Sequence, residues 1–596
     1  MAIRNHLSRS LLLALLAMVL AAGVPNIAQA ATRPHYDIQV SLDFTEASLD
    51  VVQKTTLRNN TGADLPDLVF HIVPAYFGAF TLKSAKVDGQ DVVATRNGTV
   101  LEITLNTPLA KGETGEIELR YRIDVPPQGG RFGRGEGVIA LGNSFATLAA
   151  YQGEWDRHQY VDVGDAFYCE IADFDVTVIS DVPVTIASSG RLTRLEGNLQ
   201  SLSAEGVRDF AMAVSDRYQV ESRDIDGVLV SVHATSAGRL GVYLEEAERA
   251  LRWYSANLGA YPYPTLDIAE IYAADFATAQ EYPALIFVYK SLGADGGGIG
   301  SYSDYTVAHE MAHQWFYSQV GNDQVRDPWL DEALATYLSI LPYREQSPHT
   351  FDYYFNRIVN GYKYRVSVGG DRPVNTTVYQ YPNDIAYFGI VYNKGAVFLD
   401  KLRSLMGDEE FLKLLQDYVA TYTGKLATPR AFLDMIYNRV GSDLPPLVDQ
   451  YFDYGAFAGG EGYQLDVEWP AELAISEDVE LRYSSDFQAV EAKVWLDGRL
   501  MHQGAGTEAI KFPLEDVEEG EYILRLDMLD EEGALYQQAR RVKVVNGQIA
   551  NPTLSPWEME VGDPISQGES GPVSFASPWG MFKAMERELY TASSIL

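Results

Sequence analysis

The stretch His309-Glu310-Met311-Ala312-His313 places two histidines four residues apart. On a helix, residues at this spacing lie one turn apart on the same face, so their imidazoles can bind one metal ion. Glu310 follows the first histidine and is the candidate general base that takes a proton from water at the metal. The stretch therefore predicts a helix that carries two metal ligands and the group that activates water. The alternative is a solvated helix with two unrelated histidines.

A third ligand is expected in the stretch Trp329-Leu330-Asp331-Glu332-Ala333. Residues 314–331, 18 in all, separate Glu332 from His313, which leaves room for the first helix to end and a second helix to return past the metal. Asp327-Pro328 is typical of an N-cap followed by the first residue of a helix, so we expect the second helix to begin there. Two histidines and one carboxylate are the protein ligands of catalytic zinc sites that keep a fourth position for water. These three ligands predict one Zn²⁺ per chain.

The composition limits the kind of protein and its partners. A chain of 596 residues is too long for one hydrophobic core, so we expect about three or four domains. No internal segment is apolar for long enough to cross a bilayer, so we expect no stable membrane insertion. The formal net charge of −36 disfavours nucleic acid and anionic membranes as partners. The single cysteine, Cys169, excludes an intrachain disulfide and a cysteine-rich zinc site.

The N-terminus has the pattern of a secretory signal peptide. Arg4 and Arg9 precede an apolar run from Leu11 to Val24, and Ala28-Gln29-Ala30 is a small-x-small cleavage signature. An uncleaved anchor is the alternative, although the run is short for a membrane span. We therefore expect residues 1–30 to be removed and the protein to be exported, either to the periplasm or out of the cell.

The hydrophobic pattern divides the remaining chain into four parts. Apolar and polar residues alternate from Tyr36 to Tyr218, which is typical of strands. Apolar residues then recur at helical spacing from Leu240, and a strand pattern returns from Tyr463 to Val545. The predicted parts are an N-terminal all-β domain (31–235), a catalytic domain (236–458), a β-sandwich (459–548) and a C-terminal tail (549–596).

Motifs beyond the metal ligands carry a family resemblance. The chain has a tyrosine motif, Val391-Tyr392-Asn393-Lys394-Gly395-Ala396, and the segment Leu258-Gly259-Ala260-Tyr261-Pro262-Tyr263-Pro264. Together with the two histidines, Trp315 and Glu332, they resemble the gluzincin aminopeptidases of the aminopeptidase N and leukotriene hydrolase family. Thr278-Ala279-Gln280-Glu281-Tyr282 lies where that family has Gly-x-Met-Glu-Asn. The resemblance covers residues 36–458.

The resemblance implies a fold and an activity. The expected fold is a saddle-like N-terminal β domain followed by a thermolysin-like α+β domain, and the expected activity is removal of N-terminal amino acids from peptides. Tyr392 would donate its hydroxyl to the carbonyl oxygen as charge builds up in the tetrahedral intermediate. Glu281 would bind the free α-ammonium of the substrate, so that only the first residue is released. Gln280 and Ala279 would line the same wall.

The amine-binding segment departs from the family pattern. Thr278, Gln280 and Tyr282 stand where the family has glycine, methionine and asparagine, and only Glu281 is retained. This leaves open a related gluzincin with endopeptidase, glycyl-aminopeptidase or epoxide hydrolase selectivity. A non-catalytic peptide-binding relative is a further alternative, against which the complete set of metal ligands argues. The oligomeric state is left open as well.

Overall fold

The computed structural model describes residues 33–272, 279–290, 292, 297–453 and, with short gaps, 465–545. The predicted signal peptide and the predicted C-terminal tail lie outside the described residues, so both stay predictions. The chain divides into two compact units. The first comprises Met1–Asp331, Leu338–Asp352 and Val419–Leu426, and the second comprises Glu332–Tyr337, Tyr353–Tyr418 and Ala427–Leu596.

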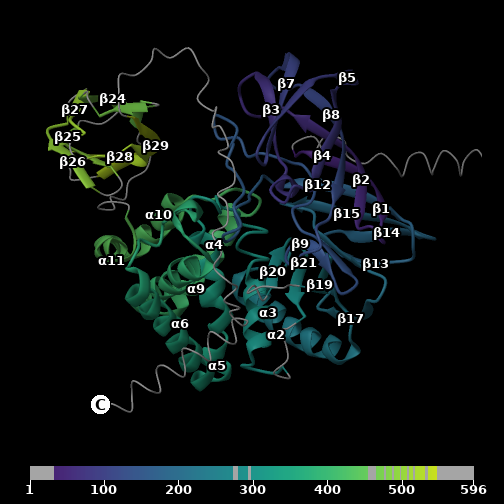
Figure 1. Ribbon diagram of the computed structural model, residues 1–596. Coiled ribbons are helices and arrows are strands. Elements are labelled where there is room, and N and C mark those ends of the chain that lie inside the picture. Colours follow the sequence, from purple (N-terminus) through teal and green to yellow (C-terminus); the bar gives the residue numbers. More distant parts are fainter. Residues whose placement is uncertain are drawn as a thin grey trace, which may run out of the picture. The chain divides into compact units, whose positions relative to one another are not determined.

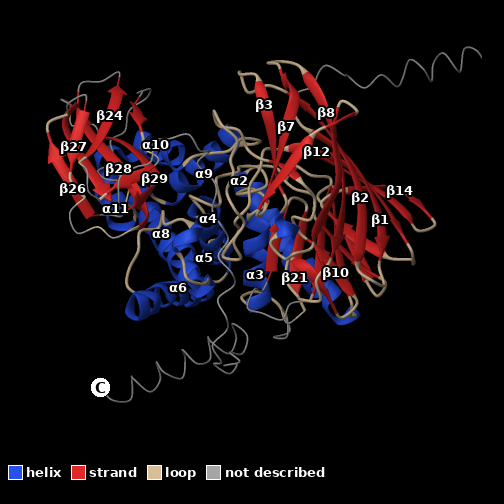
Figure 2. Cartoon of the chain, turned by 45° about the horizontal axis from the view of Figure 1, so that its top comes forward, coloured by secondary structure: helices blue, strands red, loops and turns tan. Residues whose placement is uncertain are grey.

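The first unit begins with an eight-stranded sheet in the order β14-β15-β12-β1-β2-β8-β4-β5 (Figures 1 and 2). Its strands are β1 (His35–Asp43), β2 (Ser48–Arg58), β4 (Phe80–Val87), β5 (Gln90–Asp91), β8 (Thr114–Asp124), β12 (Ala172–Ser180), β14 (Arg191–Glu196) and β15 (Leu199–Val207). Ile38, Val40 and Leu42 are buried between exposed neighbours, because successive side chains of a strand point to opposite faces. The alternating pattern of the sequence therefore marks the core face of this sheet.

Two four-stranded sheets, in the orders β13-β16-β10-β9 and β11-β3-β7-β6, complete the N-terminal β-rich part. Their strands are β3 (Leu65–His71), β6 (Val93–Asn97), β7 (Val100–Leu109), β9 (Phe132–Gly135), β10 (Val138–Leu141), β11 (Thr147–Leu148), β13 (Thr185–Ser188) and β16 (Met212–Ser215). The expected N-terminal β architecture is thus confirmed, while the exact domain boundaries stay predictions.

A mixed five-stranded sheet, in the order β17-β18-β19-β21-β20, follows in the first unit. Its strands are β17 (Gln219–Ile225), β18 (Val228–Ala234), β19 (Thr265–Ile271), β20 (Ala279–Tyr282) and β21 (Leu285–Tyr289). Helix α2 (Leu240–Leu258) packs against β17 and β18, and helix α3 (Tyr302–Ala312) packs against α2 and β20 (Figure 1). Because β17 and β18 precede residue 236, this sheet draws on both sides of the predicted domain boundary.

Helices dominate the chain from α3 to residue 451 (Figure 2). They include α4 (Trp329–Ile340), α5 (Tyr343–Gln346), α6 (Pro348–Gly369), α7 (Asp384–Tyr387), the π-helix η4 (Phe388–Lys394), α8 (Gly395–Met406), α9 (Asp408–Tyr422), α10 (Pro429–Val440) and α11 (Leu444–Tyr451). Helices α4, α6 and α9 are continuous and contain residues of both units. Within the described ranges, no helix has the length and apolar character that crossing a membrane requires.

The last described segment forms two sheets, β22-β24-β27 and β23-β29-β28-β25-β26. Their strands are β22 (Leu465–Glu468), β23 (Glu472–Ala474), β24 (Val479–Ser485), β25 (Ala489–Leu496), β26 (Arg499–Gly504), β27 (Ala509–Phe512), β28 (Gly520–Asp530) and β29 (Leu535–Val545). Leu481 from one sheet packs in the same core as Val494 and Leu526 from the other. Two sheets around one core form a β-sandwich, as the strand pattern predicts.

Candidate active site

Helix α3 carries the predicted ligand His309, and the second predicted ligand, His313, is its C-cap. The helix begins after Ser301, whose hydroxyl accepts a hydrogen bond from the Asp304 backbone N–H at 3.0 Å. Asp304 also adds a carboxylate to the first turn, where the helix dipole favours negative charge. His309 and His313 are buried, and their Nε2 atoms lie 3.2 Å apart. The Nε2 atoms of both imidazoles are therefore close enough together to bind one metal ion.

The backbone carbonyl of Phe316 orients the ring of His313. Its Nδ1 lies 3.0 Å from the carbonyl oxygen of Phe316. A carbonyl oxygen can only accept, so Nδ1 carries the proton and Nε2 keeps the lone pair that a metal needs. Metal-binding histidines regularly have such a partner on the second ring nitrogen.

Glu332 lies in the first turn of α4, which begins at Trp329, one residue after Pro328. Its carboxylate, His309 and His313 each offer one ligand atom, and these atoms all lie within 4.8 Å of one another. The three groups are buried, and two neutral imidazoles with one carboxylate fit the ligand preference of zinc.

Glu310 and Glu281 lie beside the same site. Each of them and His313 offers a ligand atom, and these atoms also lie within 4.8 Å of one another. Glu310 lies in the last turn of α3 and is buried. The predicted base and the predicted amine-binding carboxylate therefore stand close to a predicted metal ligand.

The edge strand β20 carries the predicted substrate-binding residues. It pairs antiparallel with β21, with Glu281 opposite Ile286. The Gln280 side-chain amide donates from Nε2 to Glu281 Oε2 at 2.5 Å. Gln280 and Glu281 are both buried, whereas Ala279 is half-buried at the start of the strand. Glutamine in place of the family's methionine thus places a hydrogen-bond donor on the carboxylate that is predicted to bind the substrate amine.

Asp165 is a neighbour of the site that sequence reasoning missed. Its Oδ1 accepts a hydrogen bond from Gln280 Nε2 at 2.9 Å and pairs with Arg131 Nη1 at 2.5 Å. Burial disfavours the charge of Arg131, but Asp165 holds the pKa of Arg131 well above its ordinary value. Asp165 and Gln280 are 115 residues apart in the sequence, and no motif around Asp165 signals the contact.

Hydrogen bonds on both flanks of the β20–β21 turn hold this strand beside α3. Gln314, which follows the second histidine, donates from Nε2 to the Tyr282 carbonyl at 2.9 Å. Its Oε1 accepts from the Ala284 backbone N–H at 2.9 Å. The Tyr282 hydroxyl donates to Asn143 Oδ1 at 3.1 Å, and Asn143 Nδ2 donates to Asp209 Oδ2 at 2.6 Å. Burial raises the pKa of Asp209 to about 7.

Tyr392 lies in the π-helix η4 of the second unit, and its hydroxyl donates to Glu332 Oε1. The ring of Phe388 stacks on the Tyr392 ring, with the ring centres 4.2 Å apart. Short π-helical segments are rare and often occur at functional sites. The structure thus joins Tyr392 to the predicted carboxylate ligand.

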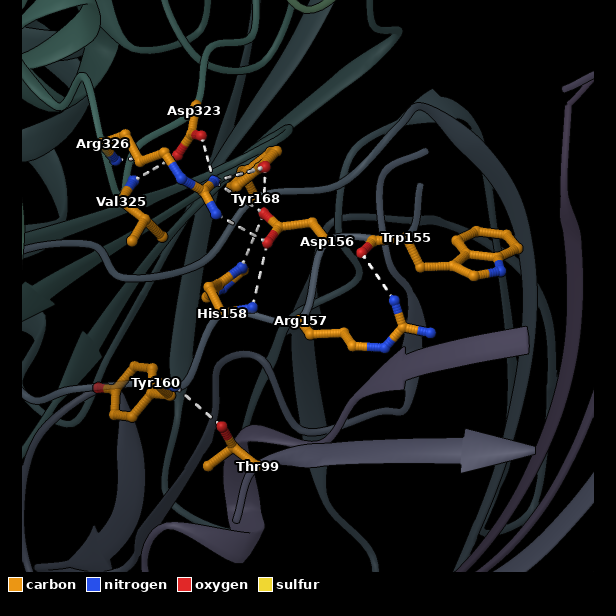
Figure 3. A network of polar contacts seen from close by, with 10 residues as sticks. All are labelled: Thr99, Trp155, Asp156, Arg157, His158, Tyr160, Tyr168, Asp323, Val325 and Arg326. Atoms are coloured by element: carbon orange, nitrogen blue, oxygen red, sulfur yellow. Dashed lines mark hydrogen bonds and ion pairs between the residues drawn. The ribbon is translucent and has the colours of Figure 1, made fainter. Parts of the chain in front are cut away.

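A polar network holds the segment that leads into α4, as Figure 3 shows. Both Nη atoms of Arg326 donate to the carboxylate of Asp156, each at 3.1 Å. Asp156 also accepts from the Tyr168 hydroxyl and lies 3.1 Å from His158 Nδ1. Burial disfavours the charge of Asp156, but its hydrogen bonds with His158 and Arg326 lower its pKa. The network anchors the approach to the helix that carries Glu332.

Part of the chain is similar to known peptidases. Residues 242–451 match the protein family described as Peptidase family M1 domain. Probable aminopeptidase 2 of Sulfurisphaera tokodaii is 28% identical over 243 residues, which are 39% of this chain and 31% of that protein. Endoplasmic reticulum aminopeptidase 2 of Homo sapiens is 28% identical over 224 residues, 36% of this chain and 23% of that protein. The chain therefore spans less than a third of the length of these relatives.

A solved structure covers more of the chain. An M1 zinc metallopeptidase from Deinococcus radiodurans matches with a TM-score of 0.56 and 22% identity, over 72% of this chain and 95% of that one. A structure of that peptidase bound to a Tyr-Ser-Ala substrate matches with a TM-score of 0.54 and 22% identity, over 70% of this chain and 93% of that one. The likeness shows a shared fold, with a β-rich N-terminal part and a helical catalytic region.

Proposed function

We propose that this chain, whose residues 242–451 are a peptidase family M1 domain, is a zinc-dependent aminopeptidase that removes the first residue of peptides. The observation that carries the proposal is the meeting of ligand atoms from His309, His313 and Glu332 within 4.8 Å. Glu310 and Glu281 lie within the same distance of His313. A metal site, a base and a carboxylate for an amine thus occur together, as cleavage next to a free N-terminus requires.

The zinc ion would be held by His309, His313 and Glu332. When bound, it supplies a Lewis acid and lowers the pKa of water to about 7. The hydrogen bond between His313 Nδ1 and the Phe316 carbonyl keeps the His313 ring in the tautomer that the ion needs. The Tyr392 hydroxyl donates a hydrogen bond to Glu332 Oε1.

Glu310 is the general base in this proposal. It takes a proton from the water that attacks the scissile carbonyl and passes that proton to the leaving amine. Its backbone is fixed one residue after His309 in α3, so the carboxylate stays beside the ligands throughout the reaction. Tyr392 exchanges its hydrogen bond with Glu332 for one to the carbonyl oxygen, where negative charge builds up in the transition state.

Glu281 is the group that makes the enzyme an exopeptidase. Its carboxylate binds the α-ammonium of the substrate and so fixes the distance from the free N-terminus to the scissile bond. The hydrogen bond from Gln280 holds this carboxylate, and Asp165 holds Gln280 in turn. Ala279, at the start of the same strand, completes the wall in this proposal.

The proposal is tested with matched pairs of aminoacyl-arylamides, one with a free amine and one N-acetylated. Cleavage of the free amine alone supports an aminopeptidase. Equal cleavage of both would refute it and favour the endopeptidase alternative. The same panel compares the cleavage rate of a glycyl-arylamide with the rates for larger first residues. A marked preference for glycine would favour the glycyl-aminopeptidase alternative.

Export is a separate part of the proposal. The basic and apolar pattern of residues 1–30 supports removal of a signal peptide and release to the periplasm or the medium. Mass spectrometry of the chain purified from its native host tests this. We expect a mature N-terminus at Ala31, and a cytoplasmic chain that retains residues 1–30 would refute export.

A further inference from the structure

Arg208 is a buried arginine just after β15, with 1% of its surface exposed. Its guanidinium donates to four backbone carbonyl oxygens, and no carboxylate of the described residues is bonded to it. The four distances are 2.7 Å to Tyr317, 3.2 Å to Cys169, 3.1 Å to Gln319 and 2.6 Å to Lys425. Burial lowers the pKa of Arg208. The carboxylate of Glu170 attracts the guanidinium but is not hydrogen-bonded to it. Burying a charge without a bonded opposite charge costs on the order of several kcal/mol, so the position calls for a reason beyond packing.

Two of these carbonyls belong to the tight turn that follows His313. The Tyr317 N–H donates to the Val320 carbonyl and the Val320 N–H donates to the Trp315 carbonyl, both at 2.9 Å. Tyr317 has a φ of 121°, which L-residues rarely adopt. Such a backbone costs about 1–3 kcal/mol and persists only where its surroundings hold it. Arg208 supplies that hold, because its Nε bonds the carbonyl of the strained residue itself.

The same turn contacts His313, one of the proposed metal ligands. Its residue Phe316 provides the carbonyl that lies 3.0 Å from His313 Nδ1. The next residue in the chain, Tyr317, is the one that Arg208 holds. A shift of the turn would therefore move the group that sets the tautomer and direction of the His313 ring.

Other parts of the turn are built around the guanidinium. Gly321 approaches it so closely that a Cβ at this position would lie 2.3 Å from Arg208 Cζ. The Gly321 N–H donates to the Lys425 carbonyl at 3.0 Å, and the Gly424 N–H donates to the Gln319 carbonyl at 2.8 Å. Arg208 bonds both of these carbonyls as well, so its planar group joins three chain segments at once. A lysine, with one nitrogen, cannot reproduce this fork of donors.

We propose that Arg208 is a positioning residue of the metal centre. It holds the turn 316–319 in its strained form, so that the Phe316 carbonyl keeps His313 Nε2 directed at the metal. The inference rests on the proposed zinc site and adds a residue from the N-terminal β-rich part to its support. Arg208 itself touches neither the metal ligands nor the substrate in this account.

The test measures zinc affinity and the visible spectrum of the cobalt-substituted full-length chain in three variants. Arg208→Met removes all four hydrogen bonds, Arg208→Lys keeps the charge, and Gly321→Ala presses on the guanidinium from the other side. Val176→Ala is the control, because it removes buried packing from β12 without touching the turn. Affinity is measured by competition with a chelator on folded protein, so that a loss of stability alone does not alter it.

We expect Arg208→Met to bind zinc about 10–100-fold more weakly than the wild type and to shift the cobalt spectrum. Arg208→Lys and Gly321→Ala should lie between the two, and Val176→Ala should match the wild type. Wild-type affinity and spectrum in Arg208→Met would overturn the inference. If that variant does not fold, wild-type values in both Arg208→Lys and Gly321→Ala overturn it. A wild type that binds no zinc would instead refute the proposed function, and the inference with it.

Discussion

Glu281→Gln removes the negative charge of the proposed amine site and keeps the size of the side chain. Glu281 is 3% exposed, so water screens its charge little. The nearby carboxylate of Asp165 is paired with Arg131 at 2.5 Å, which cancels part of its field. We therefore expect binding of the substrate α-ammonium to depend mainly on Glu281.

The size of the effect follows from the charge that is lost. Two unit charges about 4 Å apart attract by about 4 kcal/mol at an effective dielectric constant of about 20. The glutamine oxygen can still accept a hydrogen bond, which contributes about 1 kcal/mol. The remaining loss of about 3 kcal/mol corresponds to about a 100-fold fall in kcat/KM for substrates with a free amine.

The assay compares kcat/KM on a free aminoacyl-arylamide with the residual rate on its N-acetylated form. In Glu281→Gln only kcat/KM on the free amine should fall, so the ratio of the rate on the free amine to the rate on the N-acetylated form should fall as well. Glu270→Gln is the matched control, because Glu270 is a buried carboxylate of the same sheet that binds Thr235 and Arg239. Its ratio should stay at the wild-type value. An unchanged ratio in Glu281→Gln, or equal losses on both substrates, would refute the role of Glu281.

Three further predictions concern other residues. Glu310→Gln should keep one zinc per chain but lose at least about 100-fold in kcat, because no base remains; metal analysis and turnover check this, and wild-type rates would contradict it. Tyr392→Phe should lower kcat by about 100–1,000-fold with little change in KM, because its hydroxyl acts in the transition state; steady-state kinetics decide. Asp209 has a pKa of about 7 when folded, against about 3.9 in an unfolded chain. The folded chain therefore binds the extra proton between these values, and its free energy of unfolding should fall by up to about 4 kcal/mol as the pH rises from about 4 to about 7. Urea unfolding should show this fall in the wild type and not in Asp209→Asn, and parallel curves would contradict it.

The grouping of the candidate metal ligands could be predicted because their spacing is a local property. His309 and His313 are four positions apart, which is about one helical turn, and α3 with its C-cap His313 has that geometry. The position of Glu332 near the start of a helix could also be predicted, since Asp327-Pro328 is typical of a helix start and α4 begins at Trp329. The alternating apolar residues of the N-terminal part likewise mark strands whatever their neighbours are.

The supporting residues could not be predicted because they depend on the tertiary fold. Asp165 meets Gln280 across 115 residues of chain, and an isolated aspartate among 82 acidic residues carries no signal. Arg208 has the same difficulty, since its role arises from burial and from carbonyls of distant segments. The strained φ of Tyr317 has no sequence signature either, because such positions usually carry glycine.

The pairing of strands within sheets could not be predicted from the sequence pattern either. Strand β17 is exposed at most positions and β18 is buried at most positions, so neither has the alternation of the strands before them. A period of two would also not say which sheet a strand joins. These strands join the sheet of β19, β20 and β21. The π-helical turn around Tyr392 is similar, since one extra residue in a turn leaves the apolar pattern almost unchanged.

A zinc titration of the chelator-treated chain tests most directly whether one zinc ion per chain is needed for activity. Bound metal and aminopeptidase activity are measured on the same samples. The metal-free chain should show no activity, and activity should rise with added zinc to a plateau at one zinc per chain. His313→Ala should show neither tight binding nor activation, because it removes one of the three ligands. Activity in the metal-free chain, or full activation of His313→Ala by stoichiometric zinc, would contradict the account.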